Sequence, residues 1–118
     1  RSFPNFINIV IKIKTELSLD ELFKVTKTIE KQVGRKKASR NYPRKCDIDI
    51  LDFKGECLRT QVVNDIVETP HPRMHTRNFV ILPLYEVNKT WIHPKKKVNI
   101  NSLINQLKNM DFSDIRIV

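Results

Sequence analysis

Glycine and cysteine are scarce in this chain, and it has no long apolar run. Only two glycines occur among 118 residues, and no glycine- and serine-rich linker or internal repeat divides the sequence, so we expect one compact domain over residues 1–118. The two cysteines, Cys46 and Cys57, have no histidine nearby at zinc-finger spacing, which argues against a metal-thiolate site. No apolar run approaches the ~18–20 residues of a membrane span, and the N-terminus lacks a signal-peptide pattern. We therefore expect a cytoplasmic protein with no membrane partner.

Acidic residues are also few relative to basic ones. The chain has 22 lysines and arginines against 13 aspartates and glutamates, a net charge of +9. Residues 31–45 alone contain seven basic residues and no acidic one. Such a balance indicates a polyanionic partner, which charge alone leaves open as a nucleotide, a nucleic acid or an acidic membrane surface.

The first half of the chain predicts a strand followed by a helix. Residues 6–14 are rich in β-branched side chains and favour a largely buried strand. Ser18 and Glu21 form a capping-box pattern that opens a helix, and Gly34 is expected to end it. The positions expected on the buried face of this helix are Leu19, Leu22, Phe23, Thr26, Ile29 and Val33.

The second half predicts further strands and two helices. A strand is expected at 46–53, a turn at Lys54-Gly55, and a return strand near 56–60. Pro70 and Pro72 predict an irregular segment around His71. The remaining elements are a helix at 78–87 despite Pro83, a helix marked by Leu103, Ile104, Leu107 and Met110, and a last strand at 113–118. This order favours an α+β fold, an antiparallel sheet with helices packed on one face.

A cationic turn at residues 40–45 runs directly into a strand that carries Asp47 and Asp49. Side chains alternate along a strand, so the two carboxylates share one face, ~6.5–7 Å apart. Mg²⁺ is usually held by one or two carboxylates together with substrate phosphates, and arginine suits phosphate oxygens. The pattern therefore indicates a site for a metal ion and a phosphate ligand, although a surface strand with solvated charges would give the same sequence.

Two motifs indicate a particular protein family for this predicted metal and phosphate site. Pro-Arg-x-x-Asp-x-Asp-Ile-Leu at 43–51 and Thr-Pro-His-Pro-Arg-Met-His-Thr-Arg-Asn-Phe at 69–79, continuing to 87, resemble the 6-hydroxymethyl-7,8-dihydropterin pyrophosphokinase family. Phe-Ile-Asn at 6–8 is similar to that family's pterin-contacting strand. The resemblance implies a ferredoxin-like fold and transfer of pyrophosphate from ATP to 6-hydroxymethyl-7,8-dihydropterin in folate biosynthesis. The pterin hydroxymethyl oxygen would attack the β-phosphorus of ATP in line, and AMP would leave.

The resemblance also implies roles for residues around the phosphates. Asp47 and Asp49 match the pair that binds two Mg²⁺ ions bridging the ATP phosphates, and we expect both to be catalytic metal ligands. Arg44 matches a phosphate-clamping arginine, and Arg35 another on a mobile loop, so both are candidate catalytic residues. The loop is one residue shorter than in better-known members, and Asn41 stands where tryptophan is common, so loop closure is expected to differ.

Further residues match the nucleotide and pterin contacts of the family. His71 and Arg77, with Arg44, match contacts to ATP. Phe6 and Phe79 match two aromatic residues that sandwich the flat pterin, and Asn8 matches the amide that bonds its edge; periodicity alone would place both phenylalanines in the core. His75 and His93 are expected to be surface or structural residues without a catalytic role.

The sequence departs from the family at its start. Members ordinarily begin with a strand, a Gly-Ser-Asn loop, a helix and a second strand, whereas this sequence begins just before the pterin-contacting strand, so it resembles an N-terminally truncated domain. We expect weakened pterin binding and little turnover from this chain alone. The family is monomeric, and an open sheet edge could instead dimerise this chain.

Two alternatives belong to other classes. One is a basic nucleic-acid-binding module that stacks bases on Phe6 and Phe79, although Asp47 and Asp49 would repel phosphate without a metal, and we expect no specific nucleic-acid partner. The other is a catalytically inactive remnant that serves as an interaction module.

Overall fold

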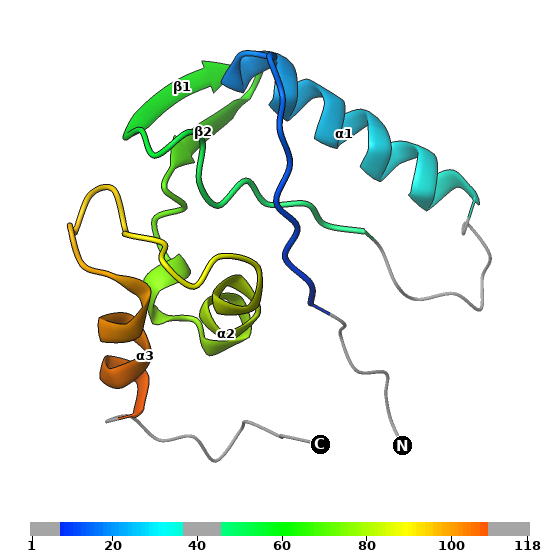
Figure 1. Ribbon diagram of the computed structural model, residues 1–118. Helices are drawn as coiled ribbons and strands as arrows, with labels where there is room; N and C mark the ends of the chain where they lie inside the picture. Colours follow the sequence, from blue (N-terminus) through cyan, green and yellow to red (C-terminus); the bar gives the residue numbers. More distant parts are fainter. Residues whose placement is uncertain (1–7, 37–45, 109–118) are drawn as a thin grey trace. The chain divides into compact units, whose positions relative to one another are not determined.

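The computed structural model describes residues 8–36 and 46–108 and shows a mixed α+β chain (Figure 1). This confirms the α+β class, while the ferredoxin-like arrangement stays a prediction. The chain separates into two compact units: Thr15–His71, here called the hairpin unit, and Pro72–Val118 with Arg1–Lys14, here called the helical unit. The single domain expected from the sequence also stays a prediction. The described elements are α1 (Leu19–Lys36), β1 (Leu58–Val62), β2 (Asp65–Thr69), the 3-10 helix η1 (Met74–Thr76), α2 (Asn78–Val87) and α3 (Ile100–Lys108).

Helix α1 begins with the capping box that the sequence predicts. The Glu21 backbone N–H donates to Ser18 Oγ at 3.2 Å, and the Ser18 N–H donates to Glu21 Oε1 at 2.9 Å. The bond from the Ser18 backbone N–H favours the charged carboxylate and lowers the pKa of Glu21. The expected end at Gly34 is wrong, because the helix continues to Lys36 and Gly34 does not take the left-handed conformation of a terminating glycine.

The core of the hairpin unit joins one face of α1 to the hairpin. Leu19 is buried with Phe53, Val62 and Val67. Thr26 is also buried, and its hydroxyl donates to the Phe23 carbonyl at 2.6 Å. The partly buried side chains packed against this core are Leu22, Phe23, Ile50 and Leu58. The predicted face therefore forms, except that Ile29 is 40% exposed.

A tight turn and a β-hairpin lie in the segment between α1 and His71. At the predicted Lys54-Gly55 turn both residues have positive φ, 56° and 69°, and the Glu56 N–H donates to the Phe53 carbonyl at 3.0 Å. The return strand, β1, lies two residues later than expected, at Leu58–Val62. It pairs antiparallel with β2, which the sequence reading did not anticipate, in the register Leu58↔Thr69 to Val62↔Asp65.

Two expected strands do not form ladders in the described part of the chain. Residues 8–14 have no regular secondary structure, and Ile9, Ile11 and Ile13 are 76%, 72% and 56% exposed, so the buried strand expected at 6–14 is wrong for the described residues. Residues 46–52 are likewise unpaired, and only Phe53 forms an isolated bridge, to Glu56. A strand requires a neighbour for its backbone groups, and β-branched composition cannot supply one.

The helical unit is built around η1, α2 and α3. The helix expected at 78–87 is confirmed as α2, with Pro83 inside it. The last predicted helix is confirmed as α3, although Met110 and the strand expected at 113–118 lie outside the described residues. The core of this unit contains Met74, Ile81, Leu84, Trp91, Ile100, Leu103 and Leu107. No helix in either described range is both long and apolar enough to cross a membrane.

Candidate functional site

The Asp47–Asp49 pair keeps the alternation expected of a strand, although no ladder holds it. Both aspartates are exposed, and Ile48 and Ile50 are half-buried. Within the described residues, no group of three or more histidine, cysteine or acidic side chains could hold a metal ion. The pair alone therefore offers too few ligands for a protein-only metal cage, but its donor type and number fit a magnesium ion that also binds phosphate oxygens.

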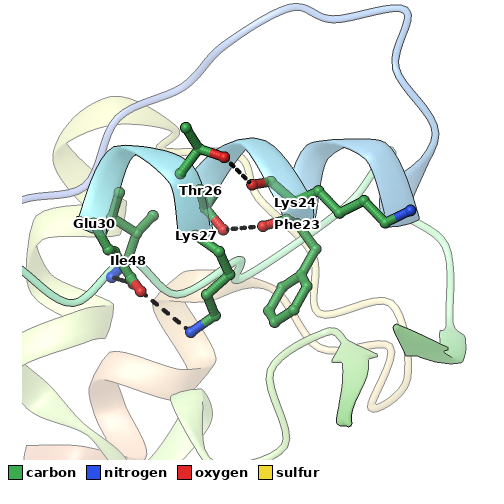
Figure 2. Close-up of polar contacts among 7 residues, drawn as sticks. Phe23, Lys24, Thr26, Lys27, Glu30 and Ile48 are labelled. Carbon is green, nitrogen blue, oxygen red and sulfur yellow. Dashed lines mark hydrogen bonds and ion pairs between the residues drawn. The ribbon is translucent and has the colours of Figure 1, made fainter. Parts of the chain in front are cut away.

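A carboxylate from α1 fixes the backbone between the two aspartates (Figure 2). Glu30 Oε2 accepts a hydrogen bond from the Ile48 backbone N–H at 2.6 Å. The other oxygen, Glu30 Oε1, lies 3.2 Å from Lys27 Nζ. Sequence reasoning missed Glu30, because no local pattern relates it to a backbone group 18 residues away. The bond shows that the candidate metal ligands flank a peptide group tied to the helix.

His71 joins the second motif to the first within the hairpin unit. It follows a cis peptide bond between Thr69 and Pro70. Its backbone N–H donates to the Leu51 carbonyl at 2.8 Å, two residues beyond Asp49. The irregular segment predicted around His71 is thus confirmed, and its backbone lies beside the segment that carries the aspartates.

Arg77 and Phe79 form a second pair of candidate residues, in the helical unit. The Arg77 guanidinium carbon lies 5.5 Å from the centroid of the Phe79 ring, which is a cation–π contact. Phe79 is 47% exposed, so the core position that periodicity favours is wrong. Arg77 is the residue before the first turn of α2, where free backbone N–H groups favour anions. The pair can offer a cation and a flat apolar surface to a ligand.

The other candidate residues are placed less fully. Asn8 is exposed, and Arg35 lies in the last turn of α1. Arg44 and Phe6 fall outside the described residues. The structure therefore places Asp47, Asp49 and His71 in the hairpin unit, and Asn8, Arg77 and Phe79 in the helical unit. A single site that includes both groups stays a prediction.

The two remaining histidines have structural surroundings. His93 is 3% exposed, and its Nδ1 accepts hydrogen bonds from the Lys95 and Lys96 N–H groups at 3.2 and 3.0 Å. Its ring makes edge contacts with Trp91 and His75, at centroid distances of 5.5 and 5.7 Å. Burial lowers the pKa of both histidines, and nearby positive charge lowers them further.

The exposed carboxylates of the hairpin unit fit a magnesium ion that also binds phosphate, and the start of α2 in the helical unit fits an anion. The particular family follows from comparison with known sequences. Residues 2–89 match the model of the 7,8-dihydro-6-hydroxymethylpterin-pyrophosphokinase (HPPK) family, and the chain belongs to that family. The resemblance drawn from the two sequence motifs is confirmed.

Curated relatives agree with this assignment. A 2-amino-4-hydroxy-6-hydroxymethyldihydropteridine pyrophosphokinase of Aquifex aeolicus is 43% identical over 90 residues, which cover 76% of this chain and 54% of that protein. The protein of the same name from Bacillus subtilis is 44% identical over 82 residues, or 70% of this chain and 47% of that protein. A folic acid synthesis protein of Dictyostelium discoideum is 38% identical over 109 residues, or 92% of this chain and 16% of that protein. The chain spans about half the length of these bacterial relatives.

Proposed function

We propose that this chain acts in the transfer of pyrophosphate from ATP to 6-hydroxymethyl-7,8-dihydropterin, a step of folate biosynthesis that releases AMP. Family membership and the names of the Aquifex and Bacillus relatives support this reaction. The observation that carries it for this chain is the exposed Asp47–Asp49 pair, with the backbone of His71 bonded two residues beyond it. This hydrogen bond joins the start of the second motif to the end of the first within the hairpin unit.

Asp47 and Asp49 would hold two Mg²⁺ ions together with the ATP phosphates. Bound there, the ions would neutralise phosphate charge and orient the transferred group. The chain's own part is to present two carboxylates from one side of an extended segment, which the exposure pattern supports. Because only two carboxylates contribute, we expect the metal ions to bind weakly without nucleotide and much better with it.

The remaining roles follow the family pattern. Arg35, Arg44, His71 and Arg77 would bind the phosphates, and arginine is suited to this because its planar fork donates two parallel hydrogen bonds. Phe6 and Phe79 would stack on the pterin, and Asn8 would bond its edge. The pterin hydroxyl would attack the β-phosphorus directly, so no covalent enzyme intermediate is needed. Positioning and electrostatic stabilisation would then supply the catalysis.

The fold proposed for this function is the ferredoxin-like sheet of the family. Membership of the family supports that arrangement. An unpaired sheet edge readily accepts a neighbouring strand. The two units would then form one domain, and either a monomer or an edge-strand dimer is consistent with the proposal.

Calorimetric titration with a non-hydrolysable ATP analogue tests the proposal. We expect binding that requires Mg²⁺, is lost in the presence of a chelator, and is strongly weakened by Asp49→Ala. Asp65→Ala is the matched control, because Asp65 is an exposed aspartate at the start of β2 with no proposed ligand role. Nucleotide binding that neither the chelator nor Asp49→Ala changes would refute the assignment of the pair.

The nucleic-acid alternative is separated by its salt dependence. A phosphate-neutralising binder loses about 0.7–0.9 log units of affinity per phosphate contact for each log unit of salt. We expect only weak, nonspecific binding to RNA or DNA, since the net charge of +9 is its main support. Sequence-selective binding that persists at physiological salt would favour the nucleic-acid module over the enzyme.

A further inference from the structure

The segment that carries the candidate metal ligands is held by a helix and not by a sheet. Residues 46–52 form no ladder within the described chain. Their peptide backbone is instead bonded to α1 at Ile48, whose N–H donates to Glu30 Oε2 at 2.6 Å (Figure 2). Ile48 is the single residue between Asp47 and Asp49. The peptide linking Asp47 to Ile48 is thus held by the Glu30 carboxylate.

The Glu30 carboxylate is itself held in place. Its side chain is 16% exposed, and Lys27 Nζ lies 3.2 Å from Oε1, which leaves Oε2 for the Ile48 N–H. Lys27 Nζ also lies 5.1 Å from the centroid of the Phe23 ring, and Phe23 packs against the core. Hydrogen bonds to a charged acceptor are roughly twice as strong as neutral ones. The acceptor of the Ile48 N–H is therefore a charged carboxylate, Glu30, whose other oxygen is held by Lys27.

Fixing this peptide also fixes the direction of its neighbours. Ile48 and Ile50 are half-buried, and Ile50 packs against the core of the hairpin unit. In an extended backbone the residues on either side of Ile48 must then point the opposite way. Both are the exposed aspartates. We propose that Glu30 is a positioning residue for the Asp47–Asp49 pair, holding the intervening peptide so that both carboxylates face one metal–phosphate site.

This inference rests on the proposed function, because it gives the aspartates their role. It differs from a purely local account, in which Glu30 stabilises α1 through its i,i+3 ion pair with Lys27. The local account predicts that Lys27→Gln lowers stability and Mg²⁺ affinity as much as Glu30→Ala does. The positioning account predicts that Lys27→Gln keeps the bond to Ile48 and therefore most of the metal affinity.

Four variants separate the accounts. Glu30→Ala removes the acceptor, Glu30→Gln keeps an oxygen acceptor without the charge, and Lys27→Gln removes only the ion pair. Gln32→Ala is the matched control at an exposed position of the same helix. The Mg²⁺ dependence of binding of the ATP analogue is measured by calorimetry, and exchange of the Ile48 amide hydrogen by NMR on the metal-free chain. Thermal unfolding of each variant shows whether the fold is retained.

For Glu30→Ala we expect faster exchange of the Ile48 amide and an apparent Mg²⁺ affinity about 10-fold lower, the low end of the effect of losing a group bonded directly to a metal ligand, because Glu30 bonds the peptide between the ligands. Glu30→Gln should recover most of both readouts, Lys27→Gln should change them less than Glu30→Ala, and Gln32→Ala should change neither. Faster exchange at Ile48 with unchanged Mg²⁺ affinity would overturn the positioning role and leave the proposed function standing. Absence of Mg²⁺-dependent binding in the unmodified chain would overturn the proposed function, and this inference with it.

Discussion

The His93 side chain gives the sharpest test of how the helical unit is held together. Its Nδ1 accepts two backbone N–H groups, from Lys95 and Lys96, so the ring must be neutral with its proton on Nε2. The backbone N–H of His93 donates to the Val98 carbonyl at 2.8 Å, and the backbone carbonyl of His93 accepts the Lys97 N–H at 2.8 Å. The ring and the backbone of His93 therefore each make two hydrogen bonds that hold the loop between Trp91 and α3.

Removing the ring should be costly, and a shorter acceptor should restore part of the loss. His93→Ala leaves two backbone donors without their partner and opens a cavity at a position that is 3% exposed. An unsatisfied buried donor costs about 1–3 kcal/mol, and water can reach part of this lysine-rich loop, so we expect a loss of about 2–4 kcal/mol in the free energy of unfolding. His93→Asn can place Oδ1 near the former Nδ1 position, so we expect a loss of about 1 kcal/mol.

The same geometry sets the pH dependence. Burial lowers the pKa of His93 below its ordinary value of 6.5, and the charges of His75, Lys96 and Lys95 lower it further. Burial, with Lys96, also lowers the pKa of His75. The unfolded chain therefore binds more protons than the folded one just below pH 6.5, so stability is complete above that pH and falls as the pH decreases. Protonation of His93 would also remove the acceptor for both loop amides.

Denaturant unfolding at several pH values, followed by tryptophan fluorescence, measures both effects. Trp91 is the single tryptophan, is buried, and contacts the His93 ring, so its emission reports on this loop. His93→Asn should lose less stability between pH 7 and 5 than the unmodified chain. The part of the pH dependence that comes from His75 should remain. Equal stability of His93→Ala and the unmodified chain at pH 7.5, or equal pH slopes for His93→Asn and the unmodified chain, would refute the reasoning.

Two predictions concern the hairpin unit. Ser18→Ala removes the acceptor of the Glu21 N–H and should lower stability by about 1 kcal/mol, with less helical circular dichroism before the transition; an unchanged melting curve would contradict a role for the capping box. Val63, an exposed β-branched residue in the turn between β1 and β2, has a φ of 57°, so Val63→Asn should raise stability by about 1 kcal/mol in denaturant unfolding, and a decrease would show that the left-handed conformation is not strained here.

Local features of this fold could be predicted from the sequence because their partners are close in the chain. The Ser18–Glu21 capping box, the Lys54-Gly55 turn and the alternation of Asp47 and Asp49 each depend on residues at most three positions apart. The expected helix end at Gly34 failed because a glycine terminates a helix when it takes the left-handed conformation itself, and Gly34 does not.

Pairing and long-range contacts could not be predicted in the same way. Residues 8–14 have strand composition but no ladder in the described chain, because pairing depends on a partner that the local sequence does not specify. Glu30 would be read as an ordinary helix-surface charge, and only the folded chain brings it to Ile48. The burial of His93 likewise follows from its contacts with Trp91 and His75 and not from its neighbours in sequence.

Helix α1 connects the predictable and unpredictable parts of the candidate site. The capping box fixes where the helix begins, and the helical repeat then sets which positions share its inner face. Phe23, Lys27 and Glu30 follow at spacings of four and three residues, so a helix that starts at Leu19 places all three on one side. The last of them reaches the Ile48 peptide, which explains how an unpaired segment can present two carboxylates in one direction. The helix that opens at the predictable cap of Ser18 thus carries Glu30, whose contact with Ile48 the sequence alone does not reveal.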